Sequence, residues 1–310
     1  MTSPRPAVVY NPSKISRDGL CDAFDRVDPD ACAAARWYET TVEDPGRGPA
    51  RDALDAGADL VIVAGGDGTV RAVAEVLAGT GIPLGIVPQG TGNLLARNLG
   101  VPIADVDAAI ARALEAGDRR IDIGWIDIDG DDEDKRAFAV MVGFGLDARM
   151  LVETDEDLKD KAGWLAYVEA LGRAVSASEV VAFDLALDDG DPERVEGHTL
   201  MIGNCGTIQG GVALLPDAAV DDGRLDLLLV SADTVTGWLD TVRSFVWDNG
   251  VRRFFVKESD TVDSDTAQHR SATRMRVELP EPLPFEIDGE EVGDVQAFTV
   301  RVDAGALIVR

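Results

Sequence analysis

Basic residues are scarce in this 310-residue chain, which carries 29 lysines and arginines against 57 aspartates and glutamates. The formal net charge of −28 leaves no basic footprint for a phosphate backbone, so we expect no nucleic-acid partner. The same deficit argues against general adhesion to an anionic bilayer. A strongly acidic surface is typical of a soluble protein.

Cysteine and histidine are equally sparse. The three cysteines, Cys21, Cys32 and Cys205, form no CxxC pair of the kind that binds metals, and we interpret them as reduced thiols. Neither His198 nor His269 lies in a motif, so we assign both to structural or solvent-facing roles.

Long apolar runs are missing as well. No segment approaches the roughly 20 apolar residues that a membrane-spanning helix needs. The segment Met1–Pro6 leads directly into the apolar Ala7–Tyr10, without the charged head of a signal peptide. We therefore predict a cytoplasmic protein, which would visit a membrane only transiently and at its surface.

Short apolar runs and helical stretches alternate along the first 120 or so residues. The predicted strands are Ala7–Tyr10, Ala35–Thr41, Asp59–Ala64 and Ile82–Val87. The predicted helices are Asp18–Val27, Arg47–Ala56, Thr69–Leu77, Thr91–Leu99 and Val106–Ala116. This alternation predicts a mostly parallel sheet covered by helices on both faces.

The pattern changes after Gly117 to short strands separated by turn residues, with one helical stretch in Leu151–Ala177 and a polar connection over Ser259–Ala272. The predicted strands are Ile121–Ile128, Ala137–Val142, Val180–Leu187, Leu200–Asn204, Leu225–Val230, Met275–Leu279, Phe285–Ile287, Phe298–Val302 and Leu307–Val309. We predict an α/β domain over residues 1–122, which residues 304–310 could rejoin, and a β-rich, sandwich-like domain over residues 123–303.

Two glycine-rich loops follow predicted buried strands. Gly65–Thr69 reads GGDGT and opens a predicted helix, where backbone N–H groups and the helix dipole favour phosphate. Asp67 could hold a phosphate-bound Mg²⁺. The second loop, Pro88–Asn93, reads PQGTGN. Carboxyl ends of strands in open α/β sheets bind ligands, so the pair predicts a cleft. A tight strand-to-helix turn, and helix capping by Asn93, are the structural alternatives.

Two acidic turns lie in the second half. Asp221-Asp222-Gly223 falls within the stretch Leu215–Asp226, and Asp288-Gly289-Glu290 follows a predicted strand. A carboxylate at a strand end could accept a proton from a hydroxyl. As bare patterns, both are more commonly explained by a hairpin turn.

In this order, the four elements resemble the diacylglycerol kinase catalytic-domain family, which includes bacterial lipid kinases and sphingosine kinases. GGDGT is shared with NAD kinases, whereas its combination with PQGTGN, the LPDA and DDG stretch and the late DGE is far more specific. The resemblance implies an NAD-kinase-like α/β nucleotide domain, a β-sandwich domain and an active site in the cleft between them.

The resemblance also implies roles for individual residues. Nucleotide contacts fall on Gly65, Gly66, Asp67, Gly68, Thr69, Val70, Arg71, Thr91, Asn93 and either Thr40 or Thr41, of which we slightly prefer Thr40. Glu290 corresponds to the general base, with Asp288 beside it, and Asp67 would position Mg²⁺. A structural Mg²⁺ site corresponds to the carboxylate of Asp222 and the carbonyls of Ala219 and Arg224.

The sequence departs from the family pattern at three places, which affect nucleotide contacts and acceptor choice more than the reaction class. Many members carry Asn at the position of Arg71, many bacterial members have Asp at the position of Leu94, and Ser13–Ile15 replaces a frequent Ser-Gly-Gly. Because the reaction class is untouched, we expect an ATP- and Mg²⁺-dependent lipid kinase, with diacylglycerol as the favoured acceptor and phosphatidic acid as the product of this step in phospholipid synthesis.

Several alternatives stay open. Phosphatidylglycerol, monoacylglycerol or a sphingoid base could be the acceptor, and a soluble-metabolite kinase or a nucleotide-binding regulator without turnover could use the same loops. The basic and aromatic segment Trp247–Lys257 could contact lipid, or form a strand with one buried face. The resemblance is compatible with a homodimer.

Overall fold

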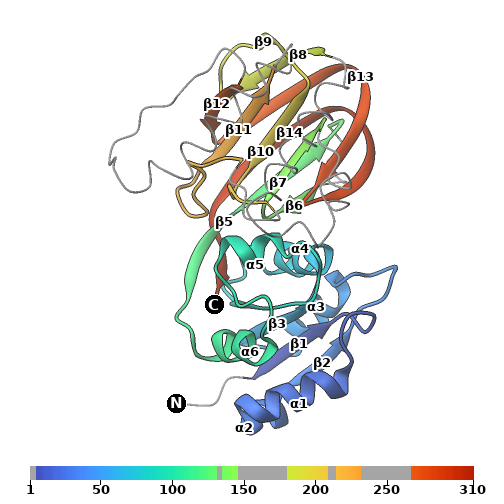
Figure 1. The fold of residues 1–310 in the computed structure, drawn as a ribbon, viewed down its shortest axis with the longest axis vertical. Helices are drawn as coiled ribbons and strands as arrows, with labels where there is room; N and C mark the ends of the chain where they lie inside the picture. Colours follow the sequence, from blue (N-terminus) through green and yellow to red (C-terminus); the bar gives the residue numbers. More distant parts are fainter. Residues whose placement is uncertain (1–4, 131–134, 146–179, 209–213, 232–266) are drawn as a thin grey trace, which may run out of the picture.

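The computed structural model describes residues 5–130, 135–145, 180–208, 214–231 and 267–310, arranged as two stacked lobes (Figure 1). The helix predicted within Leu151–Ala177 and the segment Trp247–Lys257 lie outside the described residues. Within the described ranges, no helix has the length and apolar character needed to cross a membrane.

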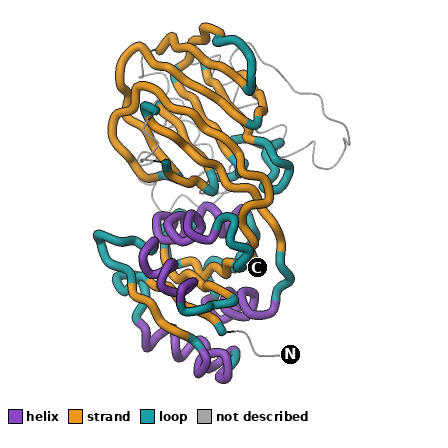
Figure 2. Tube along the Cα trace, turned by 180° about the vertical axis from the view of Figure 1, so that it is seen from behind, coloured by secondary structure: helices purple, strands orange, loops and turns teal. Residues whose placement is uncertain are grey.

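The first lobe is a parallel sheet with helices packed around it (Figure 2). Its strands run in the order β4-β3-β1-β2 and all pair in parallel. They are β1 (Pro6–Tyr10), β2 (Arg36–Glu39), β3 (Leu60–Gly65) and β4 (Leu84–Pro88). The helices are α1 (Arg17–Val27), α2 (Pro29–Ala34), α3 (Arg47–Asp55), α4 (Asp67–Leu77), α5 (Leu94–Asn98) and α6 (Val106–Glu115).

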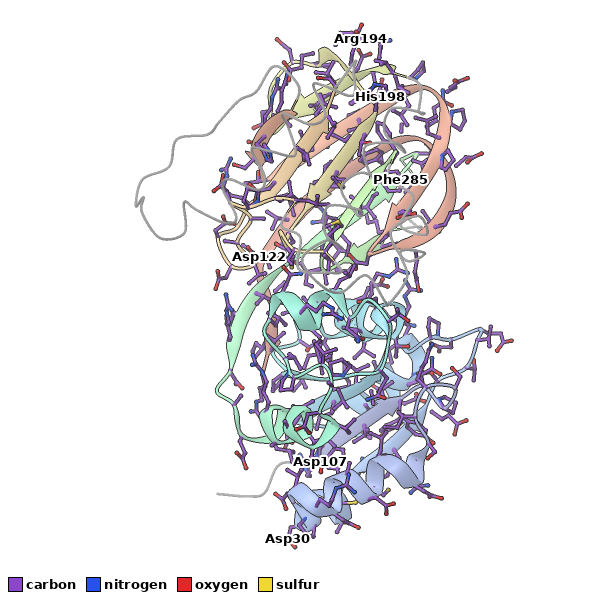
Figure 3. The ribbon with its side chains drawn as sticks, in the orientation of Figure 1. Asp30, Asp107, Asp122, Arg194, His198 and Phe285 are labelled. Atoms are coloured by element: carbon purple, nitrogen blue, oxygen red, sulfur yellow. The ribbon has the colours of Figure 1, made fainter. Side chains whose placement is uncertain are left out.

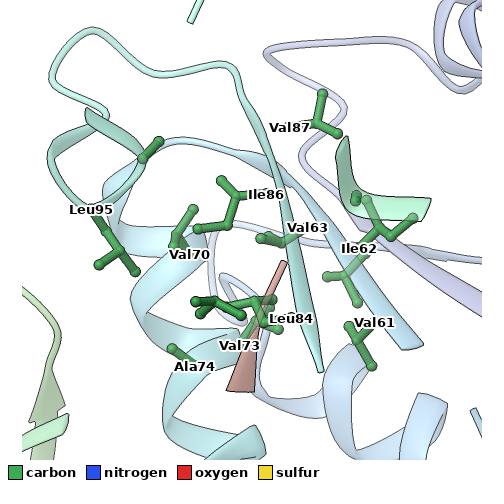
Figure 4. Close-up of a cluster of buried hydrophobic side chains, with 14 of the residues drawn as sticks. Val61, Ile62, Val63, Val70, Val73, Ala74, Leu84, Ile86, Val87 and Leu95 are labelled. Atoms are coloured by element: carbon green, nitrogen blue, oxygen red, sulfur yellow. The ribbon is translucent and has the colours of Figure 1, made fainter. Parts of the chain in front are cut away.

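The core of this lobe follows from strands that are buried on both faces. Val61, Ile62 and Val63 of β3 are fully buried and lie among Val70 and Val73 of α4 and other aliphatic side chains (Figure 4). A continuous apolar run is what a strand covered on both faces requires. The predicted α/β architecture of this lobe is therefore confirmed.

The second lobe consists of antiparallel strands around a separate core. Its strands are β5 (Arg119–Ile128), β6 (Arg136–Phe138), β7 (Met141–Phe144), β8 (Val181–Leu187), β9 (Glu193–Gly197), β10 (Thr199–Gly203), β11 (Leu225–Val230), β12 (Ala267–Ala272), β13 (Arg274–Ile287) and β14 (Glu290–Val309). Phe285, labelled in Figure 3, packs against Phe298 with ring centroids 4.7 Å apart. The predicted sandwich-like domain is confirmed.

Several predicted boundaries were wrong. The four short strands predicted after residue 274 are two long ones, β13 and β14. The strand predicted over Ala137–Val142 is split into β6 and β7. Strand β12 falls in the predicted polar connection, and α2 and β9 were missed. The N-terminus of α2 could have been recognised in the sequence, because Asp-Pro is a typical helix start. Asp28 is the N-cap residue and accepts the N–H groups of residues 30 and 31, and Pro29 starts the helix.

The two lobes are joined by strands that run through both. Val309 of β14 pairs in parallel with Leu84 of β4, and β5 runs antiparallel to β14. At the junction, the buried carboxylate of Asp122 accepts the N–H groups of Gly223 and Gly305, each at 2.7 Å (Figure 3). These contacts support our proposal that the first domain ends near residue 122 and that residues 304–310 also belong to it.

Candidate active site

A cavity of about 490 Å³ opens between the two lobes. Its wall on the first lobe is formed by the two glycine loops, and the opposite wall comes from strands of the second lobe. The polar part includes Asn11, Lys14, Asp67, Thr69, Thr91 and Glu290. The apolar part includes Met141, Val142, Phe144, Met201, Ile208 and Leu214.

The first glycine loop presents the amino end of α4 to this cavity. Gly66, Asp67, Gly68 and Thr69 all line the wall. Gly66 occupies the N-cap position, and no side chain caps the helix there. The first N–H groups of an α-helix have no partner within the helix and carry its positive dipole end. This end of the cavity is therefore suited to an anion.

The second glycine loop lies directly against the first because β3 and β4 are neighbouring parallel strands. Gly65 pairs with Pro88 at the carboxyl end of both strands. A Cβ atom on Gly90 would lie 2.7 Å from the Cα of Gly66. Contacts below 3.0 Å are not tolerated by real Cβ atoms, so this approach requires glycine.

The carboxylate of Asp67 ties the two loops together. It accepts the N–H group of Asn93 at 2.8 Å and that of Leu94 at 2.5 Å. Burial raises the pKa of Asp67, while these hydrogen bonds oppose that shift. Asp67 therefore fixes the loop geometry and still contributes to the cavity wall.

The side chain of Asn93 closes the second loop instead of capping a helix. Its amide accepts the N–H of Gly90 at 2.8 Å and donates to the Gly90 carbonyl at 2.7 Å. Asn93 has a left-handed backbone, with φ of 48°, and makes no side-chain capping bond. Both polar ends of its amide bond Gly90, so the structure places Asn93 as a support for the loop that presents Thr91.

Asp288 and Gly289 form the two-residue turn between β13 and β14, with φ of 50° and 81°. Positive φ at both positions is the type I′ hairpin geometry, so the structural alternative for this motif is confirmed. The buried carboxylate of Asp288 accepts the N–H groups of Ala139, Val140 and Met141, each at 2.9 Å. Burial raises its pKa. Asp288 thus anchors the break between β6 and β7.

Glu290 begins β14 and lines the cavity. Its half-exposed carboxylate pairs with the guanidinium of Arg71 on α4. It also lies against Gly68, so closely that a Cβ atom there would collide with Oε1. The hairpin that looked like a simple turn therefore delivers a carboxylate to the glycine loop.

The remaining nucleotide candidates divide between the cavity wall and the interior. Thr41 lines the cavity, whereas Thr40 and Val70 are 3% and 6% exposed and do not. The geometry favours Thr41 over Thr40, and the nucleotide contact itself stays a prediction. Lys14 also lines the cavity and was not among the predicted site residues, although its loop follows β1 at the same sheet edge as GGDGT.

The predicted structural metal residues, Ala219, Asp222 and Arg224, lie apart from this cavity wall. The carboxylate of Asp222 accepts the N–H of Arg224 at 2.9 Å. The described ranges contain no cluster of three or more acidic, histidine or cysteine side chains suited to a metal ion. A cation at this turn would depend on carbonyl oxygens, and the site remains a prediction.

Comparison with known proteins places both lobes in defined families. Residues 5–126 match the diacylglycerol kinase catalytic domain, and residues 140–310 match the YegS C-terminal NAD kinase beta sandwich-like domain. These matches give the molecule the two-domain architecture of a kinase, and the cavity described above lies between the two domains. The chain belongs to the diacylglycerol kinase catalytic-domain family, in the branch that carries the YegS-type C-terminal domain.

Similar proteins match either nearly the whole chain or a large part of it. A "Probable lipid kinase YegS-like" from Stenotrophomonas maltophilia is 32% identical over 98% of this chain and 94% of its own length. A "Diacylglycerol kinase" from Mycobacterium tuberculosis is 35% identical over 59% of this chain, which spans 59% of that relative's length. A crystal structure of a diacylglycerol kinase from Bacillus anthracis superposes with a TM-score of 0.69 and 20% identity, covering 100% of this chain and 97% of that one, and supports the fold alone.

Proposed function

We propose that the protein is an ATP-dependent lipid kinase that transfers the γ-phosphoryl group to a lipid hydroxyl, most favourably that of diacylglycerol, giving phosphatidic acid. One observation carries the proposal. The same cavity is lined by a glycine loop suited to an anion and by an apolar wall, and Glu290 lies in that cavity against Gly68.

The polar end of the cavity suits the phosphates of ATP. The uncapped end of α4 offers N–H donors, and Lys14 is the one lysine or arginine in the wall within the described ranges. Bound Mg²⁺ would neutralise phosphate charge, which is the main requirement of phosphoryl transfer. Asp67 lines the same end, and its carboxylate retains lone pairs beyond the two N–H groups it accepts.

The opposite end of the cavity suits a lipid acceptor. Met141, Phe144, Met201 and Leu214 present no charge, whereas a soluble phosphorylated metabolite would require basic partners. Names of the relatives point the same way, since they are called diacylglycerol kinase or probable lipid kinase. The apolar wall therefore favours a lipid over NAD or a sugar phosphate.

Glu290 is the group that we assign as general base. It accepts the proton of the lipid hydroxyl, and that oxygen forms a bond to the γ-phosphorus. The bond from the γ-phosphorus to the bridging oxygen breaks, and ADP leaves with the electron pair. Asp288 supports the base by fixing the hairpin turn rather than by contacting the acceptor.

The proposed setting is the cytoplasm, with peripheral and transient membrane contact during turnover. A homodimer and a structural Mg²⁺ at Ala219, Asp222 and Arg224 remain part of the proposal as family features. The alternative function is that of a nucleotide-binding regulator without turnover. It is less favoured, because Asp67 and Glu290, the two residues that we assign to catalysis, both line the cavity.

The test is transfer of label from γ-labelled ATP with Mg²⁺ to mixed vesicles containing diacylglycerol, phosphatidylglycerol or a sphingoid base. NAD and a sugar phosphate serve as parallel soluble acceptors. The proposal predicts label in the organic extract, and chromatography of the product then identifies the lipid. Label confined to a soluble acceptor, or ATP binding without any transfer, would refute it.

A further inference from the structure

Arg71 does not line the cavity, but it contacts Glu290, which does. Its Nη2 donates to Oε2 of Glu290, while Arg71 itself is absent from the cavity wall. Its side chain is 14% exposed, against 50% for that of Glu290. The guanidinium is thus largely enclosed in the protein and points at the carboxylate that we assign as base.

Within the described part of the chain, several acidic residues surround Glu290. Asp67 on α4 and Asp288 in the hairpin turn both lie in its vicinity, and Glu286 and Glu291 occupy the adjacent strand positions. Lys14 contributes a positive charge to the wall from the loop after β1. Closely grouped carboxylates repel one another and repel the phosphates of ATP. Among the residues that the structure describes, Arg71 supplies a positive charge in direct contact with Glu290.

The hydrogen bond from Arg71 also determines which carboxylate oxygen of Glu290 is available to accept a proton. Oε2 is held by Arg71, whereas Oε1 lies directly over Gly68, in the space that a Cβ atom on that residue would take. Oε1 therefore faces the loop that we expect to carry the γ-phosphate. A charge-assisted hydrogen bond to one oxygen fixes the orientation of the other.

We propose that Arg71 is a positioning residue that holds the carboxylate of Glu290 in place and directs Oε1 at the acceptor hydroxyl beside Gly68. This inference rests on the proposed lipid kinase function and departs from the nucleotide contact that the family resemblance implied for Arg71. The hydroxyl proton passes to Oε1, while Oε2 keeps its bond to the guanidinium throughout.

The experiment is a double-mutant cycle in the labelled-lipid assay, with wild type, R71A, E290Q and the double variant. We expect R71A to lower kcat about 10- to 100-fold while the KM for ATP stays within about twofold, because misplacement of a catalytic group affects the chemical step. In the E290Q background, removal of Arg71 should cost no more than about twofold, because a residue acting through Glu290 has nothing left to orient.

R71K provides the rescue, since an ammonium restores the charge but not the planar geometry, and its kcat should fall between those of wild type and R71A. R26A is the matched control, because Arg26 forms an ion pair with Asp107 on the surface of the first lobe, and it should behave as wild type. If R71A unfolds below the assay temperature, R71K replaces it in the comparison with wild type and E290Q.

Independent, additive losses in R71A and E290Q would overturn the inference, as would a raised KM for ATP with unchanged kcat. Failure of the wild type to label any lipid would refute the proposed function itself. The two failures are therefore distinguishable.

Discussion

Gly66 and Gly90 meet backbone to backbone at the floor of the cavity. A Cβ atom on Gly90 would lie 2.7 Å from the Gly66 Cα and 2.9 Å from Oδ1 of Asn93. The two loops can therefore keep their mutual position only while residue 90 is glycine. Because both loops line the end of the cavity where we propose that ATP binds, their spacing is a testable determinant of nucleotide binding.

The substitution G90A should weaken ATP binding by about tenfold or more and destabilise the protein by about 1–3 kcal/mol, since overpacking shifts both loops. Titration calorimetry and thermal denaturation measure the two effects. G117A is the matched control, because a Cβ on Gly117 meets nothing within 4 Å. A G90A protein that binds ATP as tightly as wild type would contradict this role.

Removal of the Lys14 charge should weaken ATP binding about 5- to 20-fold, since Lys14 is the basic residue that the described part of the cavity wall contains. Adenosine, which lacks phosphates, should bind K14A and wild type alike. The variant R51A removes an exposed positive charge from α3 and should leave both affinities unchanged. Equal weakening of ATP and adenosine binding in K14A would argue for a distorted loop rather than a phosphate contact.

Asp226 makes stability depend on pH. Burial, followed by repulsion from Asp222 and Asp217, raises its pKa to about 6. The folded state thus binds the proton more tightly than the unfolded state, so stability is highest at low pH and falls as pH rises through about 6.

Relative to wild type, D226N should therefore gain stability between pH 4.5 and 7.5, by about 1 kcal/mol after allowance for solvent screening of a half-exposed group. Urea denaturation at both pH values measures this difference. D52N, on the exposed face of α3, should show no such change between the two pH values. A constant gap between D226N and wild type at both pH values would contradict the assignment.

The α/β architecture was predictable because its signal is local. The run Asp59–Ala64 is apolar throughout, and the glycine motif follows it directly, so both strand and loop are legible from adjacent residues. The same holds for Ile82–Val87 and the second loop. Neighbouring parallel strands then bring the two loops to one sheet edge without further information.

The supporting contacts were not predictable because they join distant residues. Asp288 anchors Ala139 and Val140, about 150 positions away, and Asp122 binds Gly305. The choice between Thr40 and Thr41 depended on a single residue of register, because successive side chains at a strand end point to opposite faces. No local pattern contains these facts.

Arg71 illustrates the same limit. Its place in the GGDGTVR segment associated it with nucleotide, and only the fold brings β14 across α4 so that it meets Glu290. The residue at position 71 could be read from the sequence as a departure from the family, but its partner could not.

We propose that Glu290 removes the proton from a lipid hydroxyl while ATP occupies the glycine loops. The most direct measurement compares wild type and E290Q at saturating ATP for label transfer to diacylglycerol vesicles, with ATP affinity determined in parallel. We predict that E290Q binds ATP within about twofold of wild type and loses about 10²- to 10⁴-fold in transfer rate. Transfer by E290Q at the wild-type rate would contradict the account.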